Sequence, residues 1–182
     1  MEYQTSFLSG KTKSSVDSKK TSAFRKIKGA DVFIFTDGAS RGNPGIAGIG
    51  VYAKQGVDVV IKAGCYVGEK TNNQAEYLAL ALALFLVKKK ICRKDSCPRF
   101  IIIADSELLV RQMNGTYKVK NPVLKNIKRA IDDILDGVSC SFQHVLREKN
   151  KAADQLANQG IDKKKAVPEA FASFLLKYDV KL

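Results

Sequence analysis

The sequence has no long uncharged hydrophobic run, and this absence argues against a membrane-spanning helix. Such a helix needs roughly 18 or more apolar residues in a row. The longest apolar stretch, residues 77–87, is shorter and has the spacing of one helix face. With 182 residues and 45% hydrophobic content, the chain instead has the size and composition of one soluble domain with tails.

Cysteine is also scarce, and its four positions form no paired CxxC motif. Paired spacing of that kind is typical of structural zinc sites and of redox-active thiols. We therefore expect reduced, structural thiols in a cytoplasmic protein, with disulfides or a zinc site as the alternative. The four residues are Cys65, Cys92, Cys97 and Cys140.

Acidic residues are few: 18 stand against 31 lysines and arginines, which gives a formal net charge of +13. A surplus of this size favours a polyanionic partner, and nucleic acid is the usual one. Residues 1–30 contribute part of the surplus. They are rich in lysine, serine and threonine and have no hydrophobic period, so we expect a disordered basic arm. The alternative is an organellar transit peptide.

The pattern after this arm predicts one folded domain over residues 31–160. Apolar, β-branched runs indicate strands at residues 32–36, 47–54, 57–66, 100–104 and 139–146. Helical spacing and capping residues indicate helices at residues 75–90, 106–113 and 122–135, and from the cap Asn150 to a stop at Gly160. This order predicts an α/β protein with a mixed five-stranded sheet, its first three strands antiparallel, and helices on both faces.

Residues 161–182 are predicted to form a C-terminal extension with a short amphipathic helix. Phe171, Phe174, Leu175 and Tyr178 recur at the spacing i, i+3, i+4 and i+7. We expect this helix to pack on the domain of a monomeric protein. The alternative is a dedicated binding helix, for a partner that the sequence does not identify.

Four carboxylates are predicted to converge at one end of the sheet. Asp37 and Asp105 each end a buried strand, and Glu76 and Asp154 lie near the starts of two helices. Four acids in one place would repel one another unless cations neutralised them. Oxygen-only ligands select Mg²⁺ or Mn²⁺, and two such ions promote in-line phosphoryl displacement. The alternative is that each acid is separately a turn or cap residue.

At these positions the sequence resembles the type 1 ribonuclease H family, in its compact bacterial or archaeal form. Four blocks carry the resemblance, in the order found in the family: residues 36–45 (TDGASRGNPG), 71–76 (TNNQAE), 104–106 (ADS) and 147–158 (REKNKAADQLAN). The resemblance covers residues 31–160 and implies the ribonuclease H-like fold. It also implies a Mg²⁺-dependent endonuclease that cuts the RNA strand of RNA–DNA hybrids, leaving 3′-hydroxyl and 5′-phosphate ends.

The resemblance further implies roles for individual residues. The acids that match the ligands of two Mg²⁺ ions, which Mn²⁺ can replace, are Asp37, Glu76, Asp105 and Asp154. Positions that match contacts to the minor groove, where the RNA 2′-hydroxyls lie, are Asn43, Asn72 and Asn73. Positions that match a pocket for a phosphate of the DNA strand are Thr71 and Asn121. From the residues alone, Asn43 could instead be a turn residue and Asn72 a helix cap.

The sequence departs from the family pattern between the last strand and the last helix. Many relatives have a mobile histidine there, whereas this chain has Arg147 close by. The guanidinium of Arg147 could stabilise charge at the scissile phosphate, although it cannot transfer a proton near neutral pH. The sole histidine, His144, alternates with Phe142 and Leu146 on one strand face, so we interpret it as structural.

The chain also lacks the inserted helix and basic loop that some relatives have after the second helix. We expect the basic arm and four lysines to supply phosphate contacts in their place, unless these lysines form only a solvated helix face. The lysines are Lys118, Lys120, Lys125 and Lys128. Because the chain has no tryptophan, residues 1–30 show no sign of the aromatic hybrid-binding module of eukaryotic relatives.

Two other functions are compatible with the sequence. One is a nuclease of the same fold that acts mainly on double-stranded RNA or branched junctions, because a fold does not determine its substrate. The other is a non-catalytic module that binds nucleic acid. The four acids argue against this second alternative, because a pure binder has no need for repelling carboxylates beside a polyanion.

Overall fold

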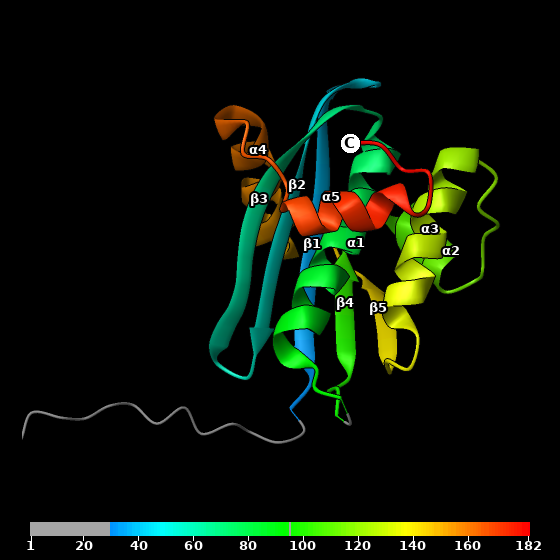
Figure 1. Ribbon diagram of the computed structural model, residues 1–182. Helices are drawn as coiled ribbons and strands as arrows, with labels where there is room; N and C mark the ends of the chain where they lie inside the picture. Colours follow the sequence, from blue (N-terminus) through cyan, green and yellow to red (C-terminus); the bar gives the residue numbers. More distant parts are fainter. Residues whose placement is uncertain (1–29, 95) are drawn as a thin grey trace, which may run out of the picture.

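A computed structural model describes residues 30–94 and 96–182, and the basic arm predicted for residues 1–30 lies outside them except for Ala30. A five-stranded sheet has helices on both faces, as the sequence predicted (Figure 1). The strands are β1 (Val32–Gly42), β2 (Gly45–Gln55), β3 (Asp58–Lys70), β4 (Phe100–Ala104) and β5 (Cys140–His144). The helices are α1 (Asn72–Ile91), α2 (Glu107–Met113), α3 (Pro122–Leu135), α4 (Lys151–Lys163) and α5 (Glu169–Leu176), with a short 3₁₀ turn, η1 (Arg147–Lys149).

The sheet order is β3-β2-β1-β4-β5, and the antiparallel meander of β1, β2 and β3 is confirmed. The strand β4 pairs with β1 in parallel and β5 pairs with β4 in parallel. Parallel pairing places the carboxyl ends of β1, β4 and β5 at one edge of the sheet. Loops that leave these ends can therefore meet there.

The first strand is longer than predicted, and this changes the setting of Asp37. The glycine-rich segment after Asp37 does not leave the sheet, because β1 stays paired with β2 from Val32↔Gln55 to Gly42↔Gly45. The turn itself contains only Asn43 and Pro44. Asp37 therefore lies inside β1 rather than at its end. It is nevertheless the first residue beyond the pairing of β1 with β4, which stops at Thr36↔Ala104.

Glycines let helices approach both faces of the sheet closely. A Cβ atom on Gly38 would overlap the backbone of α1, and one on Gly50 would overlap the backbone of α4, so these two helices lie on opposite faces. The prediction that Gly160 stops the last helix is wrong, since α4 continues to Lys163. A Cβ atom on Gly160 would lie 2.5 Å from the carbonyl oxygen of Cys65, so this glycine permits close packing of α4 on β3.

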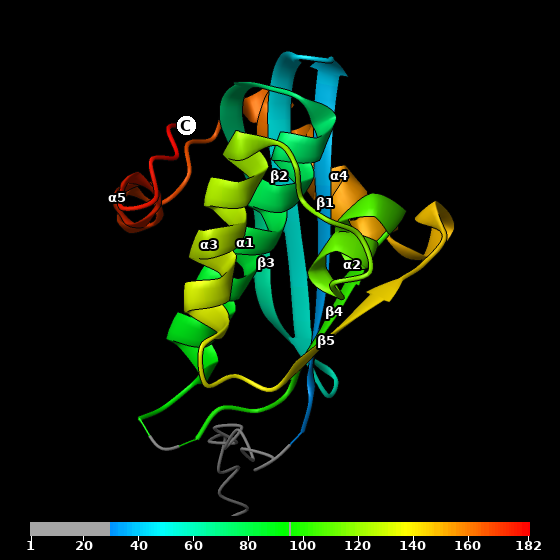
Figure 2. The same cartoon turned by 90° about the vertical axis from the view of Figure 1, so that its right-hand side faces the viewer.

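The helix α1 forms the centre of the hydrophobic core. Its residues 75–84 are all buried, because the sheet covers one side while α3 and the C-terminal segment cover others (Figure 2). The predicted C-terminal helix is present as α5 and packs on the domain. Phe171 is completely buried with its ring centroid 5.5 Å from that of Phe85 in α1, and the Tyr178 hydroxyl donates to Asp133 of α3. None of the helices in the described residues combines the length and apolarity needed to cross a membrane.

One cysteine prediction is wrong. Cys92 and Cys97 form a disulfide in the loop between α1 and β4, whereas Cys65 and Cys140 are free thiols. No sequence motif indicated this bond, because it depends on a turn in the loop. Arg93 and Ser96 pair in an antiparallel bridge, and this pairing brings the two flanking cysteines together.

Candidate active site

Three of the four predicted acids form one cluster at the edge of the sheet. Asp37 comes from β1, Glu76 from the start of α1, and Asp105 directly follows β4. Each carboxylate offers one oxygen, and these three oxygens lie within 4.8 Å of one another. The structure thus brings together three residues that are far apart in the sequence, whereas the prediction was that all four acids converge.

The backbone explains why these side chains meet. Because the pairing of β1 with β4 ends at Thr36↔Ala104, Asp37 and Asp105 are the next residues on two adjacent parallel strands. Gly38 lies against Ala75 and Glu76 with no Cβ atom between them, so the first turns of α1 come close to β1. The start of α1 is fixed by a capping box, in which Thr71 accepts from the N–H of Gln74 and Gln74 accepts from the N–H of Thr71.

Burial and mutual repulsion make the ionised cluster unfavourable by itself. Burial, followed by repulsion from Asp105 and Asp154, raises the pKa of Asp37 from 3.8 to about 7. Burial, followed by repulsion from Asp37 and Asp105, raises the pKa of Glu76 well above its usual value. The buried Glu76 Oε2 atom also has no hydrogen-bond partner within the described part of the chain. A cation bound by the cluster would offset both effects.

The ligand chemistry of the cluster fits a hard divalent cation. All three available donors are carboxylate oxygens, and no thiolate or imidazole belongs to the group within the described ranges. Oxygen donors of this kind suit Mg²⁺ and Mn²⁺ rather than zinc or copper. The unpartnered Glu76 oxygen provides a buried acceptor for such an ion.

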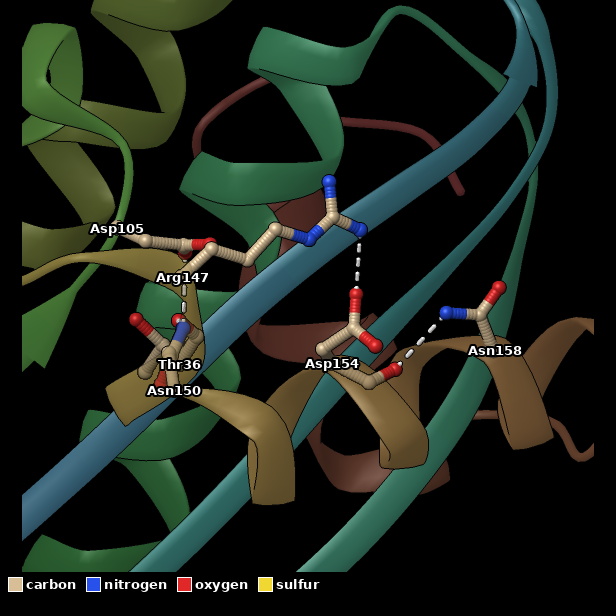
Figure 3. Close-up of polar contacts among 6 residues, drawn as sticks. All are labelled: Thr36, Asp105, Arg147, Asn150, Asp154 and Asn158. Carbon is tan, nitrogen blue, oxygen red and sulfur yellow. Dashed lines mark hydrogen bonds and ion pairs between the residues drawn. The ribbon is translucent and has the colours of Figure 1, made fainter.

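The fourth acid, Asp154, lies apart from the cluster of three. Its Oδ1 atom is 2.6 Å from Nη2 of Arg147, and its side chain is 25% exposed (Figure 3). The amide of Asn158 donates to the backbone carbonyl oxygen of Asp154 and supports the first turns of α4. Asp154 nevertheless raises the pKa of Asp37 by repulsion, so its charge acts on the cluster.

The cluster opens into a cleft of about 590 Å³. Besides the three acids, the lining includes Arg41, Asn72, His144 and Arg147. The structural interpretation of His144 is wrong: its side chain is exposed at the end of β5 and lines this cleft. The sequence suggested a longer strand, whereas β5 ends at His144 itself, so the alternation with Leu146 does not apply.

Of the asparagines predicted to contact the minor groove, Asn72 lines the cleft and Asn43 contacts Asn72. Asn43, in the turn between β1 and β2, accepts through Oδ1 a hydrogen bond of 3.0 Å from the backbone N–H of Asn72. This contact leaves the Asn43 amide nitrogen as an exposed donor. Asn72 and Asn73 are exposed in the first turn of α1. The helix cap is Thr71, so the capping alternative for Asn72 is wrong.

The two residues predicted to bind a DNA phosphate are both helix caps. Thr71 precedes α1, and Asn121 accepts through Oδ1 from the N–H of Leu124 at the start of α3. These two helices lie side by side with their N-terminal ends toward the same end of the molecule (Figure 2). Neither residue lines the cleft of the acids. Helix N-termini attract anions, which is consistent with a separate phosphate contact.

Among the described residues, one of the four lysines predicted to contact phosphate has an ion-pair partner. Lys128 contacts Asp132 at 2.8 Å, one turn further along α3. The side chains of Lys118, Lys120 and Lys125 are exposed. These three lysines are therefore available to an external anion, whereas Lys128 must exchange partners first.

Asn150 is at the N-cap position of α4, as predicted, but its side chain has a further contact that the sequence did not indicate. Its side chain makes no cap bond and instead donates to Asp105 (Figure 3). The only sequence signal was its position one turn before Asp154, which places it on the same side of α4.

Comparison with known proteins identifies related sequences and structures. Residues 35–160 match a family model described as reverse transcriptase-like. The chain is 34% identical to ribonuclease HI of Halobacterium salinarum over 78% of this chain and 70% of the relative. It is 36% identical to a bifunctional protein of Mycobacterium tuberculosis over 72% of this chain, but spans only 35% of that relative. The crystal structure of LC11-RNase H1 in complex with RNA/DNA hybrid is similar, with 43% identity, a TM-score of 0.69, and coverage of 72% of this chain and 97% of that chain.

Proposed function

The chain belongs to the type 1 ribonuclease H family, and on this basis we propose that it is a metal-dependent endonuclease that hydrolyses the RNA strand of RNA–DNA hybrids. The observation that carries the proposal is the cluster of Asp37, Glu76 and Asp105, whose carboxylate oxygens lie within 4.8 Å of one another beside an open cleft. The net charge of +13 favours a polyanionic substrate. A similar structure was determined with an RNA/DNA hybrid.

The proposed cofactor is a pair of Mg²⁺ ions, which Mn²⁺ can replace. Asp37, Glu76 and Asp105 would hold them, and Asp154 is the proposed fourth ligand. When bound, such ions would supply the activation of a water and the neutralisation of charge on the leaving oxygen, and the proposed products carry 3′-hydroxyl and 5′-phosphate ends.

Arg147 is proposed to act at the same site through its permanent positive charge. Its side chain is 74% exposed and lines the cleft while contacting Asp154. A guanidinium in this position can stabilise negative charge that develops on the scissile phosphate. It does not serve as a proton shuttle, because its pKa lies far above neutral pH.

Recognition of the hybrid is proposed to use amides and helix N-termini. The amides of Asn43, Asn72 and Asn73 are exposed, and Asn72 lines the cleft; these amides can bond to base edges and to 2′-hydroxyls, which distinguish RNA from DNA. Thr71 and Asn121, at the starts of α1 and α3, would hold a phosphate of the DNA strand.

Cleavage of an end-labelled RNA–DNA hybrid tests the proposal. We expect the RNA strand to be cut in Mg²⁺ but not in EDTA, and not by the variant Asp37→Asn. Matched RNA–RNA and DNA–DNA duplexes, assayed in parallel, show whether another substrate is preferred. If a folded protein binds the hybrid but cuts no duplex in Mg²⁺ or Mn²⁺, the chain is a binding module and the proposal is wrong.

A further inference from the structure

Asn150 occupies a buried position between three segments of the active site. Its side chain has no exposed surface. The amide nitrogen donates to the backbone carbonyl oxygen of Thr36 at 2.9 Å and to Oδ1 of Asp105 at 2.8 Å (Figure 3). Both partners are acceptors only, so the atom between them must be the nitrogen with its two hydrogens.

The position of this amide follows from the end of a strand pair. The pairing of β1 with β4 stops at Thr36↔Ala104, and the chain turns away from the sheet at Asp105. The Asn150 amide donates to the Thr36 carbonyl at the point where β4 can no longer pair. The backbone carbonyl of Asn150 also accepts from the N–H groups of Ala153 and Asp154, which begins α4.

We propose that Asn150 is a positioning residue for the metal-binding cluster. It fixes the plane of the Asp105 carboxylate by occupying one oxygen, and it leaves the second oxygen for a cation. Through its other bonds it holds together the ends of β1 and β4 and the start of α4. These segments carry Asp37, Asp105 and Asp154, so one residue sets the spacing of three acids. This inference rests on the proposed function and adds a residue that supports its metal ligands.

The chemistry of the position argues against a purely structural role. The Oδ1 atom of Asn150 is buried and has no hydrogen-bond partner within the described residues. Burial of an unpartnered oxygen is unfavourable, and an apolar side chain of the same shape would fill the space without that penalty. An amide at this position is explained by its two N–H groups, which donate to Asp105 and to the Thr36 carbonyl.

The test measures binding of Mn²⁺ to the full chain without nucleic acid, by electron paramagnetic resonance of free Mn²⁺. The variants are Asn150→Ala and Asn150→Leu, of which the second keeps the branched shape and removes both donors. We expect each to weaken Mn²⁺ binding about tenfold or more, as loss of a residue that orients a ligand does. Hybrid binding measured in EDTA should change less than about twofold, because Asn150 is buried away from the substrate.

The matched control is Gln112→Ala. Gln112 is also a buried amide that joins separate segments, since it accepts from the Tyr77 hydroxyl at 2.7 Å and donates to the Lys118 carbonyl. We expect Gln112→Ala to lower the melting temperature about as much as the Asn150 variants do, while leaving Mn²⁺ affinity unchanged. If the control weakens Mn²⁺ binding as much as the Asn150 variants do, or if a folded Asn150 variant binds Mn²⁺ like the parent, the proposal is wrong.

A measurement on the unaltered chain covers the case in which both variants fail to fold. The side-chain amide signal of Asn150 in a nitrogen-15 NMR spectrum should shift when Mg²⁺ is added, because its acceptor Asp105 becomes a ligand. An amide signal that stays in place while Mg²⁺ binds would overturn the proposal. Neither readout depends on cleavage, so failure of the proposed hydrolase activity would be distinguished from failure of this positioning role.

Discussion

The guanidinium of Arg147 lies 2.6 Å from the carboxylate of Asp154 and joins the 3₁₀ turn after β5 to the first turn of α4. This contact engages the one acid of the predicted four that is not in the cluster of Asp37, Glu76 and Asp105. Arg147 also opposes the effect of burial on the pKa of Asp37, because its positive charge favours the ionised form. The positive charge of Arg147 thus acts on both the cluster and Asp154.

Replacing Arg147 by alanine should lower turnover more than affinity. We expect kcat for hybrid cleavage to fall about tenfold to a hundredfold, because a charge that stabilises the transition state is lost. The hybrid dissociation constant and the melting temperature should change little, since exposed ion pairs contribute only about 0–1 kcal/mol. The variant Arg147→Lys, which retains the charge, should be less impaired. An unchanged kcat in Arg147→Ala would make this residue part of the solvated surface.

The variant Asp37→Asn should abolish cleavage and stabilise the metal-free fold. We expect activity to fall by at least roughly a thousandfold, as loss of an essential active-site group does. In EDTA, removal of a buried, repelled charge should raise the free energy of unfolding at pH 8 by about 1–2 kcal/mol, which is roughly 2–8 °C in melting temperature. The exposed acid Asp58, the first residue of β3, provides the control Asp58→Asn. A fully active Asp37→Asn variant would contradict the proposed site.

In the metal-free protein, the contribution of Asp37 to stability should decrease as the pH rises, which is opposite to the usual effect of a carboxylate. The pKa of Asp37 is about 7 in the folded state and 3.8 in the reference state, so between these values the folded chain holds a proton that the unfolded chain has released. The contribution of Asp37 to the free energy of unfolding therefore falls as the pH rises from about 4 to 7, by at most about 1.4 kcal/mol per pH unit. Urea unfolding of the parent and of Asp37→Asn in EDTA isolates this contribution. The advantage of the variant should grow over this range and level off above it; a constant difference would contradict the prediction.

Divalent cations should stabilise the parent chain through the acidic cluster. At a Mg²⁺ concentration ten times its dissociation constant, we expect a gain of about 1.4 kcal/mol in the free energy of unfolding. Thermal unfolding at pH 8 with increasing Mg²⁺ measures this gain, with a monovalent salt at matched ionic strength as the control. The gain should be greatly reduced in Asp37→Asn. Equal stabilisation of both proteins would mean that the ion binds elsewhere.

Replacing Gly160 by alanine should destabilise the protein although it lies in a helix. Alanine usually gains about 1 kcal/mol over glycine within a helix. Here the added Cβ atom would lie 2.5 Å from the Cys65 carbonyl oxygen, so α4 would have to move away from β3. We expect a net loss of about 1–3 kcal/mol, measured by urea unfolding. The neighbouring exposed residue provides the control Gln159→Ala, which should be nearly neutral. A stabilised Gly160→Ala variant would contradict the close packing.

Local sequence patterns predicted most elements because the responsible signals are local. The helix α3 was predicted with its observed bounds, since Asn121 and Pro122 mark its start and its apolar residues keep one helical period. The predicted ends of β1 and α4 were wrong for a common reason. Gly38 and Gly160 looked like turn or stop signals, but their partners are remote backbone segments in α1 and β3. A glycine that permits close packing and a glycine that ends an element are alike in the sequence.

The sequence by itself determined the fold class and the three clustered acids, because buried strands that end near acids and the family blocks are features of residue order. Only the tertiary structure decided which other side chains contact the acids or line the cleft beside them. It placed Arg147 on Asp154, His144 in the cleft, and the Asn150 amide between Thr36 and Asp105. These contacts join residues as much as 114 positions apart, and their geometry depends on where β4 stops relative to β1. Such a relationship arises from strand register, which no local pattern in the chain records.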